Sequence, residues 1–380
     1  MIINKKQYRR WLRYVFQDRS EIMGLRLTTT WRCNSQCTTC SIWQMDEPAG
    51  SELQVAAYDL LSKSKYLRNV EYITLSGGEP TLRDDLSQIV SVLHKNIPSA
   101  AFAITTNGLN PERIEQTFRA ILKENPGVCF SLVGLSLNGP SEIHDKTRGV
   151  KGSFDKVIET YDRINKLVPC QFSFTFCKEN ADYFDWVQEF AKKKGTSAYI
   201  CWTVMNERFK IQDEDLVFWK TGMDNVLRKY VESKFKTSRE PKTILNNLLS
   251  LPDGLAFACL YDNIVNEEDM PCYAGSQIVH IDPAGNVFPC NFKLSTDRIL
   301  GNLTEKSFDE IWEGTPRNIL REINCAECMY PNGLCGDSDI YPSLSNNPPF
   351  MMKWYLRKIL RKEQLVEKRL DGRKTRHEGL

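Results

Sequence analysis

Three cysteines lie close together at Cys33, Cys37 and Cys40, in a CxxxCxxC spacing. A cubane [4Fe–4S] cluster has four irons and is usually held by four thiolates. Three thiolates leave one iron open, and an open metal position is where a metal site can perform chemistry rather than only store electrons. The spacing therefore predicts a [4Fe–4S] cluster with an open iron.

Zinc binding and chance are the alternatives for this spacing. Structural zinc usually takes four nitrogen or sulfur ligands in paired knuckles, and the first histidine in the chain is His94. A disulfide framework is a weaker explanation, because these cysteines are odd in number and tightly spaced. The residues favour the cluster.

Composition narrows the class of protein. The 380 residues are enough for one large domain and a smaller one, and the formal net charge of +2 does not indicate a nucleic-acid-binding protein. No secretory signal opens the chain, and no run of about 18 apolar residues occurs. Because the chain nevertheless holds thirteen cysteines, we expect a reducing, cytoplasmic location with cysteines that bind metal.

Strand and helix patterns alternate through the first half of the chain. Strands are expected at 24–30, 72–76, 101–106, 129–137, 171–176 and 198–204, and helices at 54–65, 86–95, 111–124, 154–167 and 183–194. Such alternation predicts a parallel sheet, and six units predict a partial (β/α)6 TIM-type barrel. The cysteines and the turns after the next three strands would then meet at one rim, where ligands bind in such sheets.

The rest of the chain differs in composition, and we expect five sections. These are a basic N-terminal helix (1–21), the partial barrel (22–205), a helical bridge (206–268), a small α+β iron–sulfur domain (269–340) and a basic tail (341–380). Both termini mix aromatic and basic residues, which suits either a helix capping the barrel or a peripheral membrane contact. The capping helix is the preferred interpretation.

Further motifs follow the cysteine loop: Ser76-Gly77-Gly78-Glu79-Pro80, Leu135-Ser136-Leu137-Asn138-Gly139 and His144-Asp145-Lys146-Thr147-Arg148-Gly149. With the cysteine spacing, they resemble the radical S-adenosylmethionine (SAM) enzymes over roughly residues 24–204. The resemblance implies that Cys33, Cys37 and Cys40 hold a [4Fe–4S] cluster whose open iron chelates the amino and carboxylate groups of SAM.

The glycine–glutamate run resembles the motif of that family that binds the methionine amino group. Gly77 and Gly78 would allow close backbone approach, and Glu79 can accept a charge-assisted hydrogen bond from an ammonium group. The resemblance also implies that Ser136 contacts ribose and that Arg148 reaches the SAM carboxylate, which suits a guanidinium fork.

One more candidate and two departures complete this rim. Asn107, after the third strand, is a cofactor-binding candidate because it lies at the same rim. Where the family often has an aromatic residue near adenine, this chain has Thr39, and Ile42 or Trp43 is a candidate replacement. Many members have aspartate where this chain has Asn138.

Five cysteines near the C-terminus resemble the SPASM/twitch extension of the family: Cys272, Cys290, Cys325, Cys328 and Cys335. They are enough for one auxiliary [4Fe–4S] cluster. The expected ligands are Cys272, Cys290, Cys325 and Cys328, while Cys335 competes with Cys325 or Cys328. A structural zinc ribbon is the alternative. The remaining cysteines are expected in the core: Cys129, Cys170, Cys177, Cys201 and Cys259.

The resemblance implies an oxidoreductase that cleaves SAM reductively and abstracts hydrogen from a substrate C–H bond. An auxiliary cluster that accepts the second electron would favour dehydrogenation or bond formation. Flavodoxin or ferredoxin is the expected reductant. The sequence does not identify the catalytic base that would take the substrate proton.

A small-molecule, sugar or lipid-linked substrate is the first expectation. Peptide-modifying members often begin with a separate recognition domain, and only 32 residues precede Cys33. A peptide- or protein-modifying maturase and a non-catalytic iron–sulfur redox protein are the alternative functions. No nucleic acid is expected as a partner.

Overall fold

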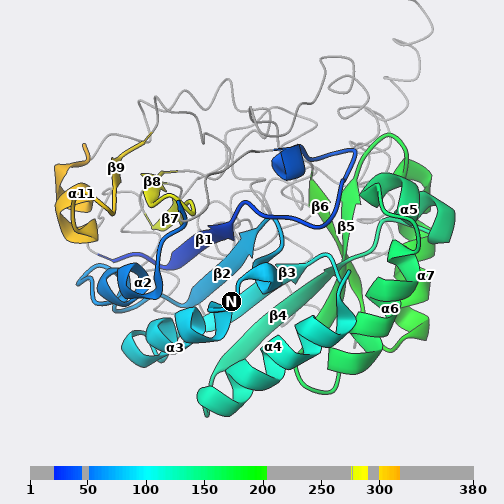
Figure 1. Cartoon of the computed structure of the whole chain (residues 1–380), viewed down its shortest axis with the longest axis horizontal. Helices are drawn as coiled ribbons and strands as arrows, with labels where there is room; N and C mark the ends of the chain where they lie inside the picture. The colour runs from blue at the N-terminus through cyan, green and yellow to red at the C-terminus, as the bar shows by residue number, and fades with distance from the viewer. Residues whose placement is uncertain (1–20, 45–50, 203–274, 276, 290–298, 317–380) are drawn as a thin grey trace, which may run out of the picture.

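A computed structural model of the chain describes residues 21–44, 51–202, 275, 277–289 and 299–316. Within these ranges the strands form one sheet in the order β6-β5-β4-β3-β2-β1-β7-β8-β9. The strands from β6 to β7 in this order are parallel, whereas β8 and β9 run antiparallel to their neighbours. The predicted partial barrel is confirmed, and its helices cover the outside of the curved sheet (Figure 1).

The barrel elements lie close to their predicted positions. The strands are β1 (Gly24–Thr30), β2 (Tyr72–Gly77), β3 (Ala101–Thr106), β4 (Cys129–Ser136), β5 (Cys170–Phe176) and β6 (Ala198–Trp202). The helices are α2 (Val55–Ser62), α3 (Leu86–Asn96), α4 (Pro111–Glu124), α5 (Ser141–Arg148), α6 (Ser153–Ile164) and α7 (Phe184–Lys193). Short 3-10 helices are η1 (Ile42–Gln44), η2 (Pro80–Leu82) and η3 (Ala181–Tyr183). Of these elements, α5 was not among the expected helices.

The outer face of the sheet carries the hydrophobic core. Helix α4 begins with Asn110, whose side chain accepts the Arg113 amide hydrogen, and Pro111 occupies the first turn. Its Ile114, Phe118 and Ile121 recur at helical spacing and are fully buried against the sheet. Each such side chain contributes roughly 1.5–3 kcal/mol by leaving water.

The inner face has a different composition. Most residues that alternate with the buried outer positions on β2 to β5 are small or polar, with Leu132 as an apolar exception: Thr74, Ser76, Ala103, Thr105, Gly134, Ser136, Ser173 and Thr175. A closed eight-stranded barrel instead fills its interior with bulky branched side chains. The inner face of this sheet therefore suits polar ligands better than a hydrophobic filling.

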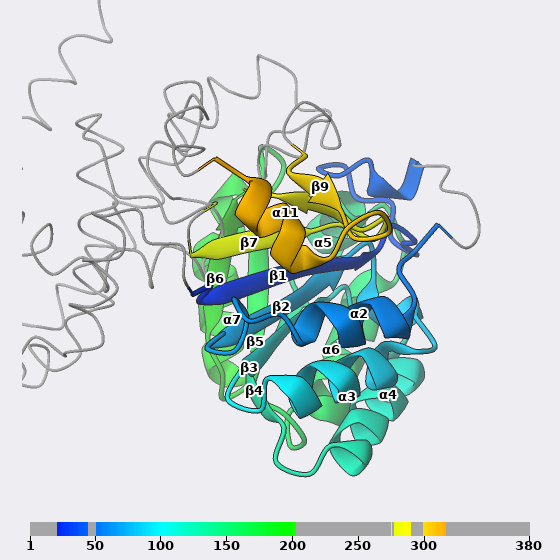
Figure 2. The same ribbon diagram turned by 90° about the vertical axis from the view of Figure 1, so that its left-hand side faces the viewer.

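The C-terminal strands join the barrel sheet directly. They are β7 (Ile278–Ile281), β8 (Asn286–Phe288) and β9 (Gly301–Asn302), followed by α11 (Phe308–Gly314). β7 pairs in parallel with β1, with Gly24 opposite Ile278. Figure 2 shows α11 beside these strands, and Lys65 after α2 forms an ion pair with Glu313 of α11 at 2.5 Å. These strands extend the barrel sheet beyond β1.

Several of the predicted sections of the chain are not covered by the described residues. The N-terminal helix, the helical bridge, the basic tail and most of the auxiliary-cluster section lie outside the described residues, and their boundaries stay predictions. Within the ranges that the structure describes, none of the helices has the length and apolar character needed to cross a membrane.

The prediction that the other cysteines are core residues is partly wrong. Cys177 is buried, but Cys129 is exposed because it opens β4 at the strand end away from the site, and Cys170 and Cys201 are half-buried. Cys259 lies outside the described residues.

Candidate active site

The cysteine loop follows β1 and is held by the C-terminus of α5. The last carbonyl groups of a helix have no partner inside it. Here the Thr147 carbonyl accepts the Thr38 amide hydrogen at 2.9 Å, and the Arg148 carbonyl accepts that of Gln36 at 3.0 Å. The helix end therefore sets the backbone path of the loop between its cysteines.

Gly149 makes this contact possible. Its backbone is left-handed, with φ of +65°, and a Cβ there would lie 2.2 Å from the Gln36 carbonyl oxygen. A glycine after the last helical residue is the common end of a helix because it tolerates this conformation. A side chain at this position would push the cysteine loop away from α5.

The cysteine side chains suit a cluster better than a single ion. Burial, with a smaller contribution from the neighbouring cysteines, raises the pKa of Cys33 to about 11 and that of Cys40 to about 12. Metal binding must therefore release their protons. Within the described residues, no group of three ligand side chains is close enough to hold one metal ion. Cluster thiolates each bind a different iron, so three cysteines in one loop fit three irons of a [4Fe–4S] cluster.

The glycine–glutamate run lies directly against the stem of the cysteine loop. The amide of Gly78 donates to the Thr30 carbonyl, and that of Glu79 donates to the Arg32 carbonyl, both at 2.8 Å. A Cβ on Gly78 would lie 2.2 Å from the Arg32 oxygen. The predicted close approach at Gly77 and Gly78 is thus an approach to the chain itself, and it brings Glu79 to the loop.

Glu79 is buried and accepts hydrogen bonds on both carboxylate oxygens. Its Oε1 accepts from the Thr81 amide and from the Thr81 and Thr106 hydroxyls, and its Oε2 accepts from the Asn107 amide at 2.6 Å. Burial raises the pKa of Glu79, while these hydrogen bonds oppose the rise. Because Oε2 has one donor among the described residues, it retains capacity to accept from a bound ammonium group.

Asn107 connects Glu79 to the cysteine loop. Its side-chain amide donates to Asn34 Oδ1 at 2.7 Å and lies 3.8 Å from Cys33 Sγ. Its own side-chain oxygen accepts the Leu109 amide hydrogen. The structure therefore places Asn107 beside Cys33, at the rim where the sequence predicted it.

Arg148 reaches the same loop from α5. Its Nη1 lies 3.3 Å from Cys37 Sγ, and its buried Nε–H has no partner among the described residues. The guanidinium fork can therefore contact a second acceptor, such as a carboxylate, through its other edge. Cys33, Cys37, Glu79, Asn107 and Arg148 thus form one connected site.

Ser136 lies at the end of β4 and is buried, but within the described part of the chain no hydrogen bond joins its hydroxyl to these residues. Ile42 is buried and Trp43 is 38% exposed, so of the two it is Trp43 that remains accessible beside the loop.

His144 is a site residue that the sequence analysis quoted without assigning a role. Its Nδ1 accepts the Asn138 amide hydrogen at 3.0 Å, which ties the end of β4 to α5. Burial and nearby Arg148 lower its pKa to about 3, against the opposing charge of Asp145, so the ring is neutral at physiological pH. The only sequence feature that pointed to His144 was its place in the motif that runs to Arg148.

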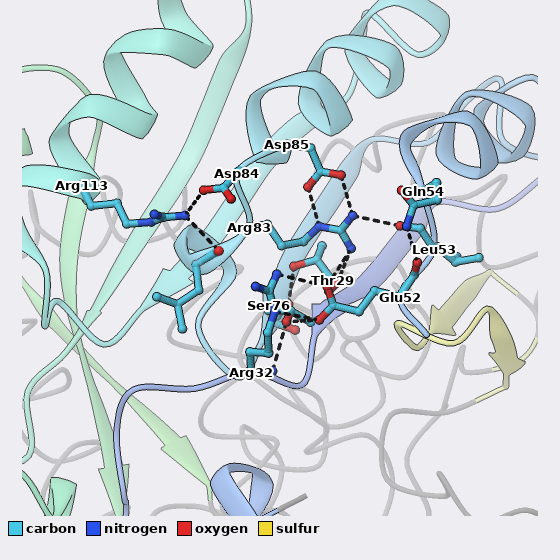
Figure 3. Close-up of polar contacts among 12 residues, drawn as sticks. Thr29, Arg32, Glu52, Leu53, Gln54, Ser76, Arg83, Asp84, Asp85 and Arg113 are labelled. Carbon is cyan, nitrogen blue, oxygen red and sulfur yellow. Dashed lines mark hydrogen bonds and ion pairs between the residues drawn. The ribbon is translucent and has the colours of Figure 1, made fainter. Parts of the chain in front are cut away.

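Arg83 was also missed, although it is the buried cation that braces the stem of the cysteine loop (Figure 3). It donates to the Thr29 carbonyl at 2.8 Å and the Leu53 carbonyl at 2.9 Å, and it forms a two-point ion pair with Asp85. Glu52, beside it, also pairs with Arg32 in the loop. The end of β1, the start of α2 and the start of α3 are thereby joined behind the site.

Two family models match the chain. The radical SAM superfamily matches residues 27–191, and an iron–sulfur cluster-binding domain, SPASM, matches residues 272–329. The barrel, the three-cysteine loop and these matches agree: the chain belongs to the radical SAM superfamily. It is a member with a C-terminal SPASM domain, and its cofactors are [4Fe–4S] clusters and SAM.

Similar proteins include a maturase and a synthase. The mycofactocin maturase MftC of Mycolicibacterium smegmatis is 26% identical over 82% of this chain and 74% of its own length. The Fe-coproporphyrin III synthase of Methanosarcina barkeri is 26% identical over 78% of this chain and 74% of its own length. SuiB of Streptococcus suis, solved with S-adenosylmethionine, shares the fold with a TM-score of 0.57 at 16% identity, covering 83% of this chain and 73% of SuiB.

The auxiliary-cluster cysteines lie outside the described residues: Cys272, Cys290, Cys325, Cys328 and Cys335. The SPASM match begins at residue 272 and ends at residue 329, so it includes the first four of them. Which of these cysteines bind the auxiliary cluster stays a prediction.

Proposed function

We propose that the protein is a radical SAM enzyme that modifies a peptide or protein substrate. The sequence analysis placed this function second, after a small-molecule substrate. Two observations now favour it. MftC is a maturase, and SuiB, which shares the fold, has also been solved bound to its precursor peptide SuiA.

The proposal that this site binds SAM is based on the pair of opposite charges beside the cysteine loop. Glu79 is joined to Cys33 through Asn107, and Arg148 contacts Cys37. A carboxylate acceptor and a guanidinium donor so arranged complement the ammonium and carboxylate groups of an amino acid. We assign the three cysteines to the cluster, and Glu79 and Arg148 to the methionine part of SAM.

When bound, the cluster and SAM supply a one-electron reductive cleavage that yields a 5′-deoxyadenosyl radical able to abstract hydrogen. The chain's own residues position and enclose these groups. Glu79 orients the ammonium end and Arg148 the carboxylate end. The close contact of residues 77–79 with residues 30–32 keeps Glu79 at the loop, and the hydrogen bonds from Gln36 and Thr38 to the end of α5 keep Arg148 there. Ser136, at the end of β4, is the ribose candidate.

A small-molecule substrate is the second candidate, because the Fe-coproporphyrin III synthase is as similar to this chain as MftC is. Both functions require the same cleavage of SAM. They differ in the substrate that stimulates it.

The test measures 5′-deoxyadenosine formed by the anaerobically reconstituted, reduced protein. A peptide-containing extract of the source cells is added either intact or after exhaustive protease digestion and inactivation of the protease. Stimulation that digestion removes supports a peptide substrate. Stimulation that survives digestion and passes a 1-kDa membrane, a cut-off of roughly nine residues, would overturn it in favour of a small molecule.

Cys37→Ala is the matched control, because it removes one cluster ligand from the loop. It is expected to form no 5′-deoxyadenosine under any condition. A wild-type protein that keeps its cluster but never cleaves SAM would instead support a non-catalytic redox protein. We also retain flavodoxin or ferredoxin as reductant, and a cytoplasmic location, as predictions.

A further inference from the structure

The three cysteines of the loop differ in their hydrogen-bond donors. Cys37 Sγ lies 3.3 Å from Arg148 Nη1 and 3.1 Å from the Ser35 hydroxyl. Cys33 Sγ lies 3.5 Å from the Ser35 amide and 3.8 Å from the Asn107 side-chain nitrogen. Among the described donors to these sulfurs, only the one from Arg148 is charged.

Ser35 does not compete for this role. A hydroxyl has one hydrogen to donate, and the Ser35 hydroxyl donates to the Arg148 carbonyl at 3.1 Å. A protonated Cys37 can donate to the serine oxygen, but a Cys37 thiolate has no hydrogen. When Cys37 is a cluster ligand, Arg148 is therefore the donor whose hydrogen is free to meet the sulfur.

The position of Arg148 strengthens this contact. The residue is 8% exposed, and a charge-assisted hydrogen bond is stronger where water is scarce. The backbone of the same residue accepts from Gln36 and Ser35, so the cysteine loop and the guanidinium share one anchor. The distance from Nη1 to Cys37 is thus set by the end of α5.

We propose that Arg148 acts through Cys37 to raise the reduction potential of the cluster. The inference rests on the proposed function, in which these cysteines hold that cluster. Reduction adds negative charge to the cluster and its sulfurs, and a hydrogen bond from a cation stabilises the reduced form more than the oxidised form. Arg148 thereby makes the cluster easier to reduce before any contact with SAM.

The same guanidinium can also couple the cluster to SAM. Its Nε–H has no partner in the described part of the chain, so a SAM carboxylate can bind that edge while Nη1 stays on Cys37. The negative charge of the carboxylate would partly cancel the effect of the Arg148 positive charge on the Cys37 sulfur. The change in potential caused by SAM should therefore depend on Arg148.

The experiment is an electron paramagnetic resonance redox titration of full-length, reconstituted protein without SAM. The signal followed is the one that Cys37→Ala lacks, which separates it from an auxiliary cluster. Arg148→Met removes the charge and the donors, Arg148→Gln keeps an N–H donor, and Arg148→Lys keeps the charge. Arg119→Met is the matched control, since Arg119 is an exposed arginine on α4 paired with Glu115.

We expect Arg148→Met to lower the midpoint potential, Arg148→Lys and Arg148→Gln to lie between it and wild type, and Arg119→Met to match wild type. Equal midpoints for wild type and the Arg148 variants at equal iron and sulfide content would overturn the inference. If Arg148→Met binds no cluster, the midpoint potentials of Arg148→Lys and Arg148→Gln are compared with wild type instead, and values equal to wild type would overturn the inference. SAM cleavage by the wild type would leave the proposed function intact in either case.

Discussion

The outer face of the sheet and the rim that carries the cysteine loop are built from different interactions. On the outer face, side chains such as Phe118 and Ile114 are fully buried and contact one another across α4 and the sheet. At the rim, backbone groups bind backbone groups: α5 carbonyls hold the loop, and the glycine–glutamate run contacts residues 30–32. Hydrophobic burial is not directional, whereas each rim contact fixes one atom against another.

This difference predicts that stability and cofactor binding can be changed separately. Changes to the outer face should lower the free energy of unfolding while the folded fraction still binds the cluster. Changes at the rim should impair the site by more than their effect on unfolding suggests. The following substitutions test that separation, beginning with the largest expected effect.

Phe118→Ala should lower the free energy of unfolding by about 3–5 kcal/mol, because it removes a fully buried ring that contacts Phe130 with centroids 5.6 Å apart. Denaturant titration measures the loss, and iron per folded chain should equal that of wild type. A folded variant that had lost its iron would contradict the separation of the two regions.

Gly78→Ala should lower the free energy of unfolding by up to about 3 kcal/mol. Its Cβ would lie 2.2 Å from the Arg32 carbonyl oxygen, so the two backbone segments must separate. Equilibrium binding of SAM should weaken by roughly tenfold or more, since Glu79 moves with residue 78. Gly314→Ala in α11 is the control, because nothing lies within 4 Å of its added Cβ. Unchanged SAM affinity in Gly78→Ala would contradict the role of this contact.

His144 should make the fold sensitive to mild acid. Its pKa is about 3 in the folded state and about 6.5 in an unfolded chain, so the unfolded state binds an extra proton between these values. Stability therefore falls as pH decreases below about 6.5, by about 2 kcal/mol between pH 7 and pH 5. His144→Asn keeps an acceptor for the Asn138 amide but cannot titrate. The difference in free energy of unfolding between wild type and this variant should therefore decrease by about 2 kcal/mol from pH 7 to pH 5. Parallel pH dependences for the two proteins would contradict the assignment.

Ser307→Ala should have the smallest effect, about 1 kcal/mol. Ser307 and Glu310 form a reciprocal capping box at the start of α11, and the substitution leaves the Glu310 amide without its partner. Thermal unfolding measures the loss. SAM affinity should not change, because the capping box lies at the start of α11 and makes no contact with the residues assigned to SAM binding.

Much of the barrel could be predicted because its elements have strong local patterns. The expected helix at 111–124 matches α4, where Pro111 begins the helix and apolar residues recur at helical spacing. The cysteine loop, Glu79 and Arg148 were identified from motifs, and the structure brings them together. Their substrate could not be predicted, because it depends on side chains supplied by several parts of the chain.

The missed features depend on contacts between distant residues. α5 is only eight residues long and strongly polar, and its carbonyls are satisfied by the cysteine loop more than 100 residues away. The role of Arg83 appears only when Thr29, Leu53 and Asp85 are adjacent. The exposure of Cys129 likewise depends on where β4 starts, which the residue type does not reveal.

The pairing of β7 with β1 has a consequence for dissecting the molecule. β1 hydrogen-bonds to β2 on one side and to β7 on the other. A fragment truncated after residue 202 would leave the strand that leads into the cysteine loop as an unprotected edge, and such edges recruit foreign strands. The two halves of this chain are therefore not interchangeable modules, and a chimaera that replaces the C-terminal half must supply a strand to lie beside β1.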